Sequence, residues 1–186
     1  VIAWHCIILT LYTYICTIAT TKDNINISKQ LSFYRLWNLV LLKSSYLISR
    51  ITRRSQHMGL PFSLSIEPTT ACNLGCPECP SGLKKFTRPT GKLDLMLHRT
   101  MIQQLKRSVF YINYYFQGEP FLHPDFLELI KEAKRNKIYT ATSTNAHFID
   151  KKKAAEIVVS GLDRLIISID GLTQQTYENY RINGQL

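Results

Sequence analysis

Acidic residues are scarce in this sequence. Its 186 residues include 23 Lys and Arg but only 13 Asp and Glu, which gives a formal net charge of +10. Between Asn24 and Ile66 there are six basic residues and no acid. Such an excess fits an acidic partner, an anionic membrane surface or nucleic acid, although a solvated basic helix face has the same composition. The hydrophobic content of 45% excludes a disordered chain.

Residues 1–21 contain no Lys, Arg, Asp or Glu. The absence of a basic region before this stretch, and of a small-residue cleavage site after it, argues against a secretory signal peptide. The stretch is long enough to span a bilayer. Because the sequence does not begin with Met, two interpretations stay open: a membrane anchor, or an extension that is not native.

Cysteines are few, and three of the five lie close together. Cys6 and Cys16 fall in the apolar stretch, whereas Cys72, Cys76 and Cys79 lie within eight residues of one another. An odd, tightly clustered set is a poor disulfide framework and binds metal more often in a reducing compartment. We therefore expect a metal site and a cytoplasmic protein.

The order of predicted elements indicates an α/β fold. A basic amphipathic helix over 27–54 ends before Gly59 and Pro61. From residue 62 onward, strand and helix alternate four times, at about 30 residues per unit. The predicted strands are 62–67, 109–116, 138–144 and 165–169, and the helices are 96–107, 124–136, 150–160 and 173–180. This alternation predicts a parallel sheet with helices outside it.

Polar residues follow every predicted strand. The three cysteines follow the first strand, and the sequences QGEP (117–120), STN (143–145) and SIDG (168–171) end the next three. Gly, Asn and Asp are also ordinary turn residues. In parallel α/β folds, however, chemistry takes place at the carboxyl ends of the strands. We therefore expect one metal site and three ligand-binding corners on a common rim.

The spacing C-x3-C-x2-C suits three corners of a cubane iron–sulfur cluster, whose fourth iron then has no protein ligand. An open coordination position is what catalysis at a metal requires. The alternative is a zinc knuckle with a distant histidine, but no histidine has the usual zinc-finger spacing. The candidates are His57, His98, His123 and His147.

These motifs together resemble the radical S-adenosylmethionine (SAM) superfamily over residues 62–186, whose signature is this cysteine spacing. The run SIDG…YENYR after TSTN and QGEP is similar to the subgroup with a C-terminal SPASM domain, which includes sulfatase-maturating and peptide-modifying enzymes. The resemblance implies a partial parallel (β/α) barrel. Four of the usual six units are present, so we expect a core that is incomplete at its C-terminus.

The resemblance also implies a [4Fe-4S] cluster on Cys72, Cys76 and Cys79, together with bound SAM. The implied SAM contacts are Gly118, Glu119, Ser143, Asn145, Ser168, Asp170 and Arg181. Glu119 would accept from the SAM ammonium, and Arg181 would pair with its carboxylate. Four of these residues also have a simpler possible role. Glu119 would be a loop acid, Asn145 and Asp170 would be helix caps, and Arg181 would be a surface arginine.

The implied activity is reductive cleavage of SAM to a 5′-deoxyadenosyl radical, which takes hydrogen from an unknown substrate such as a peptide or protein. The implied partner is a small electron donor such as flavodoxin or ferredoxin. Nucleic acid is not expected as a partner of the core, and residues 1–54 are the candidate contact with a membrane surface. Two other classes stay open: a noncatalytic iron–sulfur or zinc module, and a basic membrane- or nucleic-acid-associated protein.

Two positions depart from the family pattern. Glu78 stands where an aromatic residue often precedes the third cysteine, and Gln117 replaces the first Gly of the usual Gly-Gly-Glu. The adenine contact expected at residue 78 is therefore in question. The aromatic run Tyr111, Tyr114, Tyr115 and Phe116 is interpreted as strand packing.

Overall fold

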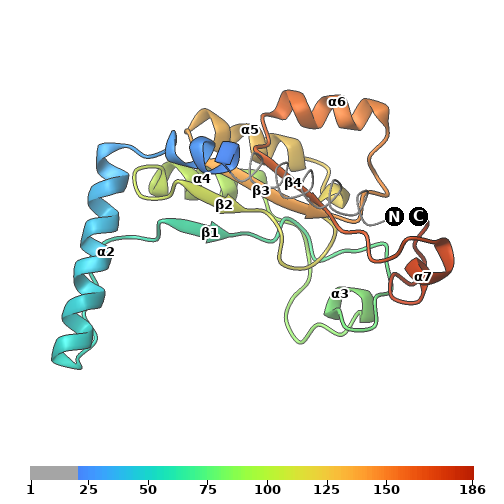
Figure 1. Ribbon diagram of the computed structural model, residues 1–186, viewed down its shortest axis with the longest axis horizontal. Coiled ribbons are helices and arrows are strands. Elements are labelled where there is room, and N and C mark those ends of the chain that lie inside the picture. Colours follow the sequence, from blue (N-terminus) through green and yellow to red (C-terminus); the bar gives the residue numbers. More distant parts are fainter. Residues whose placement is uncertain (1–20) are drawn as a thin grey trace, which may run out of the picture.

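The computed structural model describes residues 21–186, which form a four-stranded parallel sheet with the strand order β1-β2-β3-β4 (Figure 1). The strands are β1 (Ser63–Ser65), β2 (Tyr111–Asn113), β3 (Tyr139–Thr144) and β4 (Arg164–Ile167). Each pairs in parallel with the next one in sequence. The sheet confirms the predicted α/β fold, a partial barrel in which all four strands end at the same edge.

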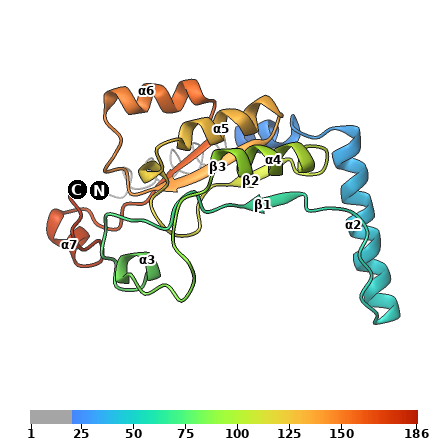
Figure 2. The same ribbon diagram turned by 180° about the vertical axis from the view of Figure 1, so that it is seen from behind.

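Three helices cover one face of the sheet: α4 (Leu95–Leu105), α5 (Phe126–Arg135) and α6 (Lys151–Ser160) (Figure 2). Two of them, α4 and α6, begin at aspartates whose side chains cap the first turn. The Asp94 carboxylate accepts from Leu97 N and the Asp150 carboxylate from Lys153 N, as N-caps do. The buried core between helices and sheet consists of Ile102, Val109, Ile112, Tyr114, Phe126, Leu129, Ile130, Ala133 and Ile138.

The element types were predicted correctly, but several boundaries were wrong. The predicted helix 27–54 is interrupted at residues 29–32, and α2 (Phe33–Thr52) begins after Ser32, whose hydroxyl accepts from Arg35 N. The predicted helix 124–136 is α5, and the short 3-10 turn η1 (Pro120–Leu122) precedes it. Sequence reasoning missed both η1 and α3 (Pro80–Leu83), since each is less than two turns long. The predicted helix 173–180 is shorter, as α7 (Gln174–Glu178).

Helix α2 extends from the end of the molecule where the strands begin, and α3 and α7 lie at the opposite end (Figure 1). Arg35, only 3% exposed, attaches α2 to the sheet domain. Its guanidinium donates to the backbone oxygens of Lys106 and Asn136, at the C-termini of α4 and α5, over 2.8 and 3.0 Å. Helix C-termini carry partial negative charge, so a buried cation suits this position.

Among the described residues, no helix has both the length and the apolar content that a bilayer crossing requires. Apart from Thr21, the apolar stretch predicted over 1–21 lies outside the described residues, as do Cys6 and Cys16. Its interpretation as an anchor or as a non-native extension therefore stays a prediction.

Candidate active site

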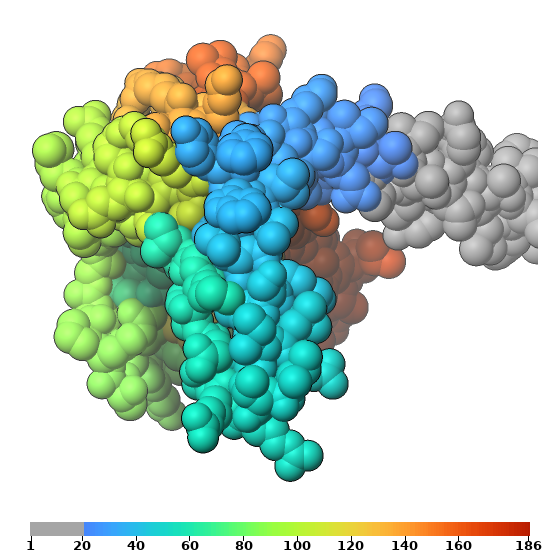
Figure 3. Space-filling model, turned by 90° about the vertical axis from the view of Figure 1, so that its left-hand side faces the viewer, coloured from blue at the N-terminus to red at the C-terminus, as the bar shows by residue number. Residues whose placement is uncertain are grey.

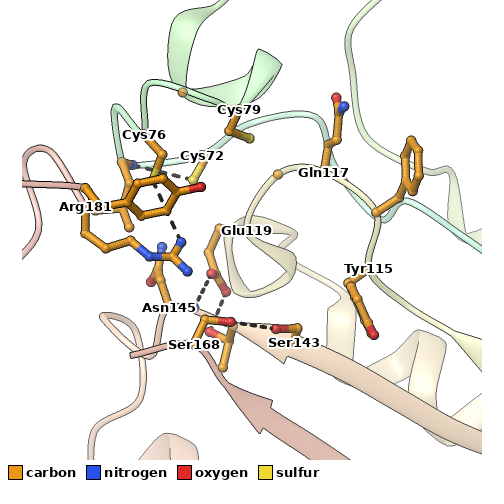
Figure 4. Close-up of a pocket in the computed structure, with 16 residues that line it drawn as sticks. Cys72, Cys76, Cys79, Tyr115, Gln117, Glu119, Ser143, Asn145, Ser168 and Arg181 are labelled. Carbon is orange, nitrogen blue, oxygen red and sulfur yellow. Dashed lines mark hydrogen bonds between the residues drawn. The ribbon is translucent and has the colours of Figure 1, made fainter. Parts of the chain in front are cut away.

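A cavity of about 220 Å³ lies at the carboxyl ends of the strands (Figure 4). The loops after all four strands contribute to its wall, as the strand-end rule predicts. Every predicted site residue except Asp170 lines it, namely Cys72, Cys76, Cys79, Gly118, Glu119, Ser143, Asn145, Ser168 and Arg181. Residues up to about one hundred positions apart in the sequence therefore meet around one space.

The loop over residues 71–82, which carries the three cysteines and is called the Cys loop below, is held by its neighbours. Glu119 N donates to Ala71 O over 2.8 Å, and Gly75 N donates to Ile182 O over 2.9 Å. The Ser81 hydroxyl accepts from Gly118 N over 2.9 Å. Backbone from the loop after β2 and from the C-terminal segment thus fixes the path of the Cys loop.

The residues of the Cys loop fit a cluster held by three thiolates. All three thiols are free and all three line the cavity. In the part of the chain from 21 to 186, no three His, Cys, Asp or Glu side chains are grouped to hold a single metal ion. A zinc ion needs its sulfur ligands within about 2.3 Å, whereas a cluster distributes its ligands over separate irons. The three thiols of the Cys loop can therefore serve as ligands of separate irons.

Gly118 occupies a position that only glycine can take. Its φ is +76°, and a Cβ there would lie 2.0 Å from Thr69 O and 3.0 Å from Ala71 O. The missing side chain lets the loop after β2 pass directly against the start of the Cys loop.

Glu119 is a buried carboxylate, 2% exposed, in the wall of the cavity. It accepts from Phe121 N at 3.2 Å, from the Thr144 hydroxyl at 2.7 Å and from Asn145 N at 2.9 Å. The first of these bonds caps the start of η1. Glu119 therefore has the structural role of a loop acid and also lines the cavity. These three donors fix the direction of the carboxylate.

Side chains from the ends of β3 and β4 complete the wall. The hydroxyls of Ser143 and Ser168 lie 2.9 Å apart, which joins the two strand ends (Figure 4). The Asn145 amide nitrogen donates to the Asn73 side chain over 2.8 Å. The Asn145 amide oxygen accepts from His147 N. Asn145 therefore both caps the following turn and contacts the Cys loop.

Arg181 brings a positive charge next to the thiols. Its Nη1 lies 3.8 Å from Cys76 Sγ, and its Nε pairs with the Asp170 carboxylate at 2.5 Å. Burial lowers the pKa of Arg181, but Asp170 and Cys76 outweigh burial and raise it. Burial also raises the pKa of the Cys72 thiol, against the opposing effect of the Leu74 N–H. Asp170 thus reaches the site only through Arg181.

Some cavity residues were missed by sequence reasoning. The prediction of strand packing agrees with Tyr111, which stacks on Tyr139, and with Tyr114, which is buried. It was wrong for Tyr115 and Phe116, because β2 ends at Asn113 and both residues line the cavity. Thr144 and Tyr180 were also missed, because each lies within a named motif, STN (143–145) and YENYR, but was assigned no role there. Glu78 is exposed and is not part of the cavity wall.

Comparison with known proteins identifies the family. Residues 66–185 match the model of the radical SAM superfamily. The chain belongs to this superfamily. Radical SAM enzymes use a [4Fe-4S] cluster and SAM, so the predicted family and cofactor pair are confirmed.

Curated relatives of this radical SAM chain include two named enzymes. It is 34% identical over 139 residues to the mycofactocin maturase MftC of Mycobacterium ulcerans, covering 74% of this chain and 37% of the relative. It is 30% identical over 124 residues to the PqqA peptide cyclase of Gluconobacter oxydans, covering 67% and 34%. The chain therefore spans about a third of the length of these relatives.

Among solved structures, Streptococcus suis SuiB bound to S-adenosylmethionine is similar to this chain with a TM-score of 0.55 and 20% identity. The similarity covers 74% of this chain and 31% of SuiB. It agrees with the partial barrel described above and bears on the fold alone.

Proposed function

We propose that this chain is the part of a radical SAM enzyme that binds the [4Fe-4S] cluster and SAM and starts radical chemistry on a peptide substrate. The observation that supports this function is the shared cavity. The three free thiols of the Cys loop line the same space as the buried carboxylate of Glu119 and the guanidinium of Arg181.

In this proposal Cys72, Cys76 and Cys79 hold three irons of the cluster. When bound, the cluster would pass on one electron from an external donor to break the C5′–S bond of SAM, which gives methionine and a 5′-deoxyadenosyl radical that would take a hydrogen atom from the substrate. The protein's own contribution is to bind, orient and shield the reactants from water.

The polar residues of the cavity match the functional groups of SAM. Glu119, oriented by three donors, offers its remaining acceptor capacity to the ammonium. Arg181, oriented through Nε by Asp170, has further N–H groups for the carboxylate. The hydroxyls of Ser143 and Ser168 suit the ribose, and Asn145 and the backbone of Gly118 add polar contacts.

The peptide substrate is inferred from the relatives, one of which is named a PqqA peptide cyclase and another a mycofactocin maturase. A small electron donor such as flavodoxin or ferredoxin would reduce the cluster, and a reducing cytoplasm would keep the thiols free.

Anaerobic reconstitution of the full-length protein with iron and sulfide tests the function. We expect a brown protein with the absorption of a four-iron cluster, and release of 5′-deoxyadenosine when it is reduced in the presence of SAM. A protein that carries the cluster and binds SAM without giving this product would instead be a noncatalytic iron–sulfur module.

The ligand assignment is tested separately with Cys76→Ala. This variant should lose the cluster absorption and most of its bound iron, because it lacks one of the three protein ligands. Cys16→Ala is the matched control, since it removes a thiol outside the Cys loop and should retain the iron. Retention of the cluster by Cys76→Ala would exclude this set of ligands.

A further inference from the structure

One side of helix α2 is apolar and faces solvent. The residues that form this side recur at helical spacing and are called the α2 stripe: Phe33, Leu36, Trp37, Val40, Leu47 and Ile51. All six are exposed, from 46% at Val40 and Leu47 to 82% at Ile51. Figure 3 views the molecule from the α2 end. It shows the helix at the front, with no described segment between the helix and the viewer.

The opposite side of α2 faces the protein, and it combines polar residues with the half-buried Leu42. Arg35, Asn38 and Ser45 are its buried residues. Asn38 accepts from Leu60 N and donates to Leu60 O, both over 2.8 Å, and so fixes the returning chain. The most buried residues of α2 are therefore polar, whereas a surface helix usually turns its apolar side inward. A continuous apolar surface of this kind marks an interaction site.

The charges around the stripe indicate what covers it. Lys43 and Arg50 lie along one edge of the stripe. Their cationic groups are 5.7 and 5.9 Å from the centre of the Tyr46 ring. Arg53 and Arg54 follow the end of the helix, and no acid occurs between Asn24 and Ile66. The apolar side contains Trp and Phe, and the charged residues next to it are all cations. Such a surface is complementary to a bilayer with anionic headgroups.

We propose that α2 lies in the plane of an anionic membrane surface, with the α2 stripe inserted among the acyl chains near the headgroups and the flanking cations against the lipid phosphates. A helix of 20 residues is about 30 Å long, which gives a contact of several turns. The proposal does not depend on the chemistry of the cavity, which lies at the other end of the sheet.

Co-sedimentation of the full chain with vesicles tests the proposal. The probes are vesicles of phosphatidylcholine alone and vesicles of phosphatidylcholine with about one third phosphatidylglycerol. We expect binding to the anionic vesicles that weakens at about 0.5 M salt, because salt screens the headgroup charge. Trp37→Ser/Val40→Ser should bind at least tenfold more weakly, as about two apolar side chains leave the bilayer.

Matched variants on α6 distinguish the stripe from general apolarity and charge. Val158→Ser/Val159→Ser changes two exposed apolar side chains and should bind as the unaltered protein does. Lys43→Gln/Arg50→Gln should lose about tenfold in affinity for anionic vesicles, whereas Lys151→Gln/Lys152→Gln should lose little. Circular dichroism should show the same helix content in all variants.

Two results would overturn the proposal. One is equal vesicle binding by Trp37→Ser/Val40→Ser and the unaltered chain. The other is failure of the unaltered chain to bind, together with a dimer in light scattering that Trp37→Ser/Val40→Ser converts to a monomer. The second result would show that another copy of the chain covers the α2 stripe.

Discussion

Gly118 stands where the loop after β2 touches the Cys loop, and its substitution is the sharpest test of the site at the scale of one residue. Gly118→Ala would place a Cβ 2.0 Å from Thr69 O at a φ of +76°. The backbone must move, so we expect a loss of about 3 kcal/mol in the free energy of unfolding and a loss of reconstituted iron. Chemical denaturation and iron analysis measure the two effects.

The control for Gly118 is Gly91→Ala, since no atom lies within 4 Å of a Cβ built at Gly91. That variant should unfold at the same denaturant concentration as the unaltered protein. An equally stable Gly118→Ala would mean that the contact between the two loops is absent.

Phe116 is the candidate aromatic partner for the adenine of SAM, because Glu78 leaves no aromatic side chain before the third cysteine. Phe116 is exposed and lines the cavity. Phe116→Ala should weaken SAM binding to the reconstituted protein about tenfold, the loss expected for a base that no longer stacks on a ring. Calorimetric titration measures the affinity. Phe148→Ala is the control, and equal affinities in both variants would exclude the stacking role.

Single residues also show what the sequence reveals about the site. Cys72 and Glu119 belong to short motifs with a chemical reason for their spacing, and both were predicted. Phe116 lies in no such motif, and Thr144 lies within STN (143–145) without a role assigned to it. Their place in the cavity depends on where β2 ends and on a hydroxyl that donates to Glu119, and neither can be read from a linear pattern.

At the scale of elements, the joint between α2 and the sheet domain depends on Arg35. Arg35→Ala removes a buried guanidinium and leaves the carbonyls of Lys106, Asn136 and Lys137 without this donor. We expect a loss of about 3 kcal/mol in the free energy of unfolding, measured by urea denaturation. Arg35→Lys should restore only part of it, because an ammonium lacks the planar fork of donors.

Arg50→Ala serves as the control for the joint, since Arg50 is an exposed arginine of the same helix. It should change the free energy of unfolding by less than about 0.5 kcal/mol. A similar loss in both variants would mean that α2 stabilises the domain through charge in general and not through the joint.

The element pattern was readable because hydrophobic periodicity changes clearly between strands and helices from residue 62 onward. Boundaries were less readable, for identifiable reasons. Ser32 caps α2 inside a stretch without Pro or Gly, and β2 stops before its aromatic run does. The role of Arg35 was hidden as well, because the three carbonyls through which it reaches the sheet domain lie 71 to 102 residues away in the sequence.

At the scale of the whole molecule, stability should depend on pH through His98. This side chain is fully buried, and its Nε2 lies 2.7 Å from the Tyr114 hydroxyl. Burial lowers the pKa of His98 from 6.5 to about 4. The folded state therefore holds the neutral form, so stability is complete above pH 6.5 and falls as the pH decreases toward 4, by about 3 kcal/mol.

Urea denaturation between pH 7 and pH 4 measures this dependence. His98→Gln should give a less steep decline, because no group at that position takes up a proton on unfolding. His57→Gln, at an exposed histidine, should retain the steep decline. The same slope in His98→Gln and the unaltered protein would assign the decline to other groups.

The arrangement of the whole cavity was predictable in outline, because parallel strands end at one edge and each predicted strand was followed by polar residues. The connection of Asp170 to the cavity through Arg181, by contrast, required the structure.

The rigid joint at Arg35 has a consequence for how the molecule is oriented. A domain on a flexible linker turns freely and presents every side in succession. Here the direction of α2 is fixed to the sheet, since one buried guanidinium bonds to the ends of α4 and α5. A membrane or protein that binds α2 therefore also determines the direction in which the cavity faces. The cavity lies at the opposite end of the sheet. A substrate would then always approach from the side opposite to the attachment.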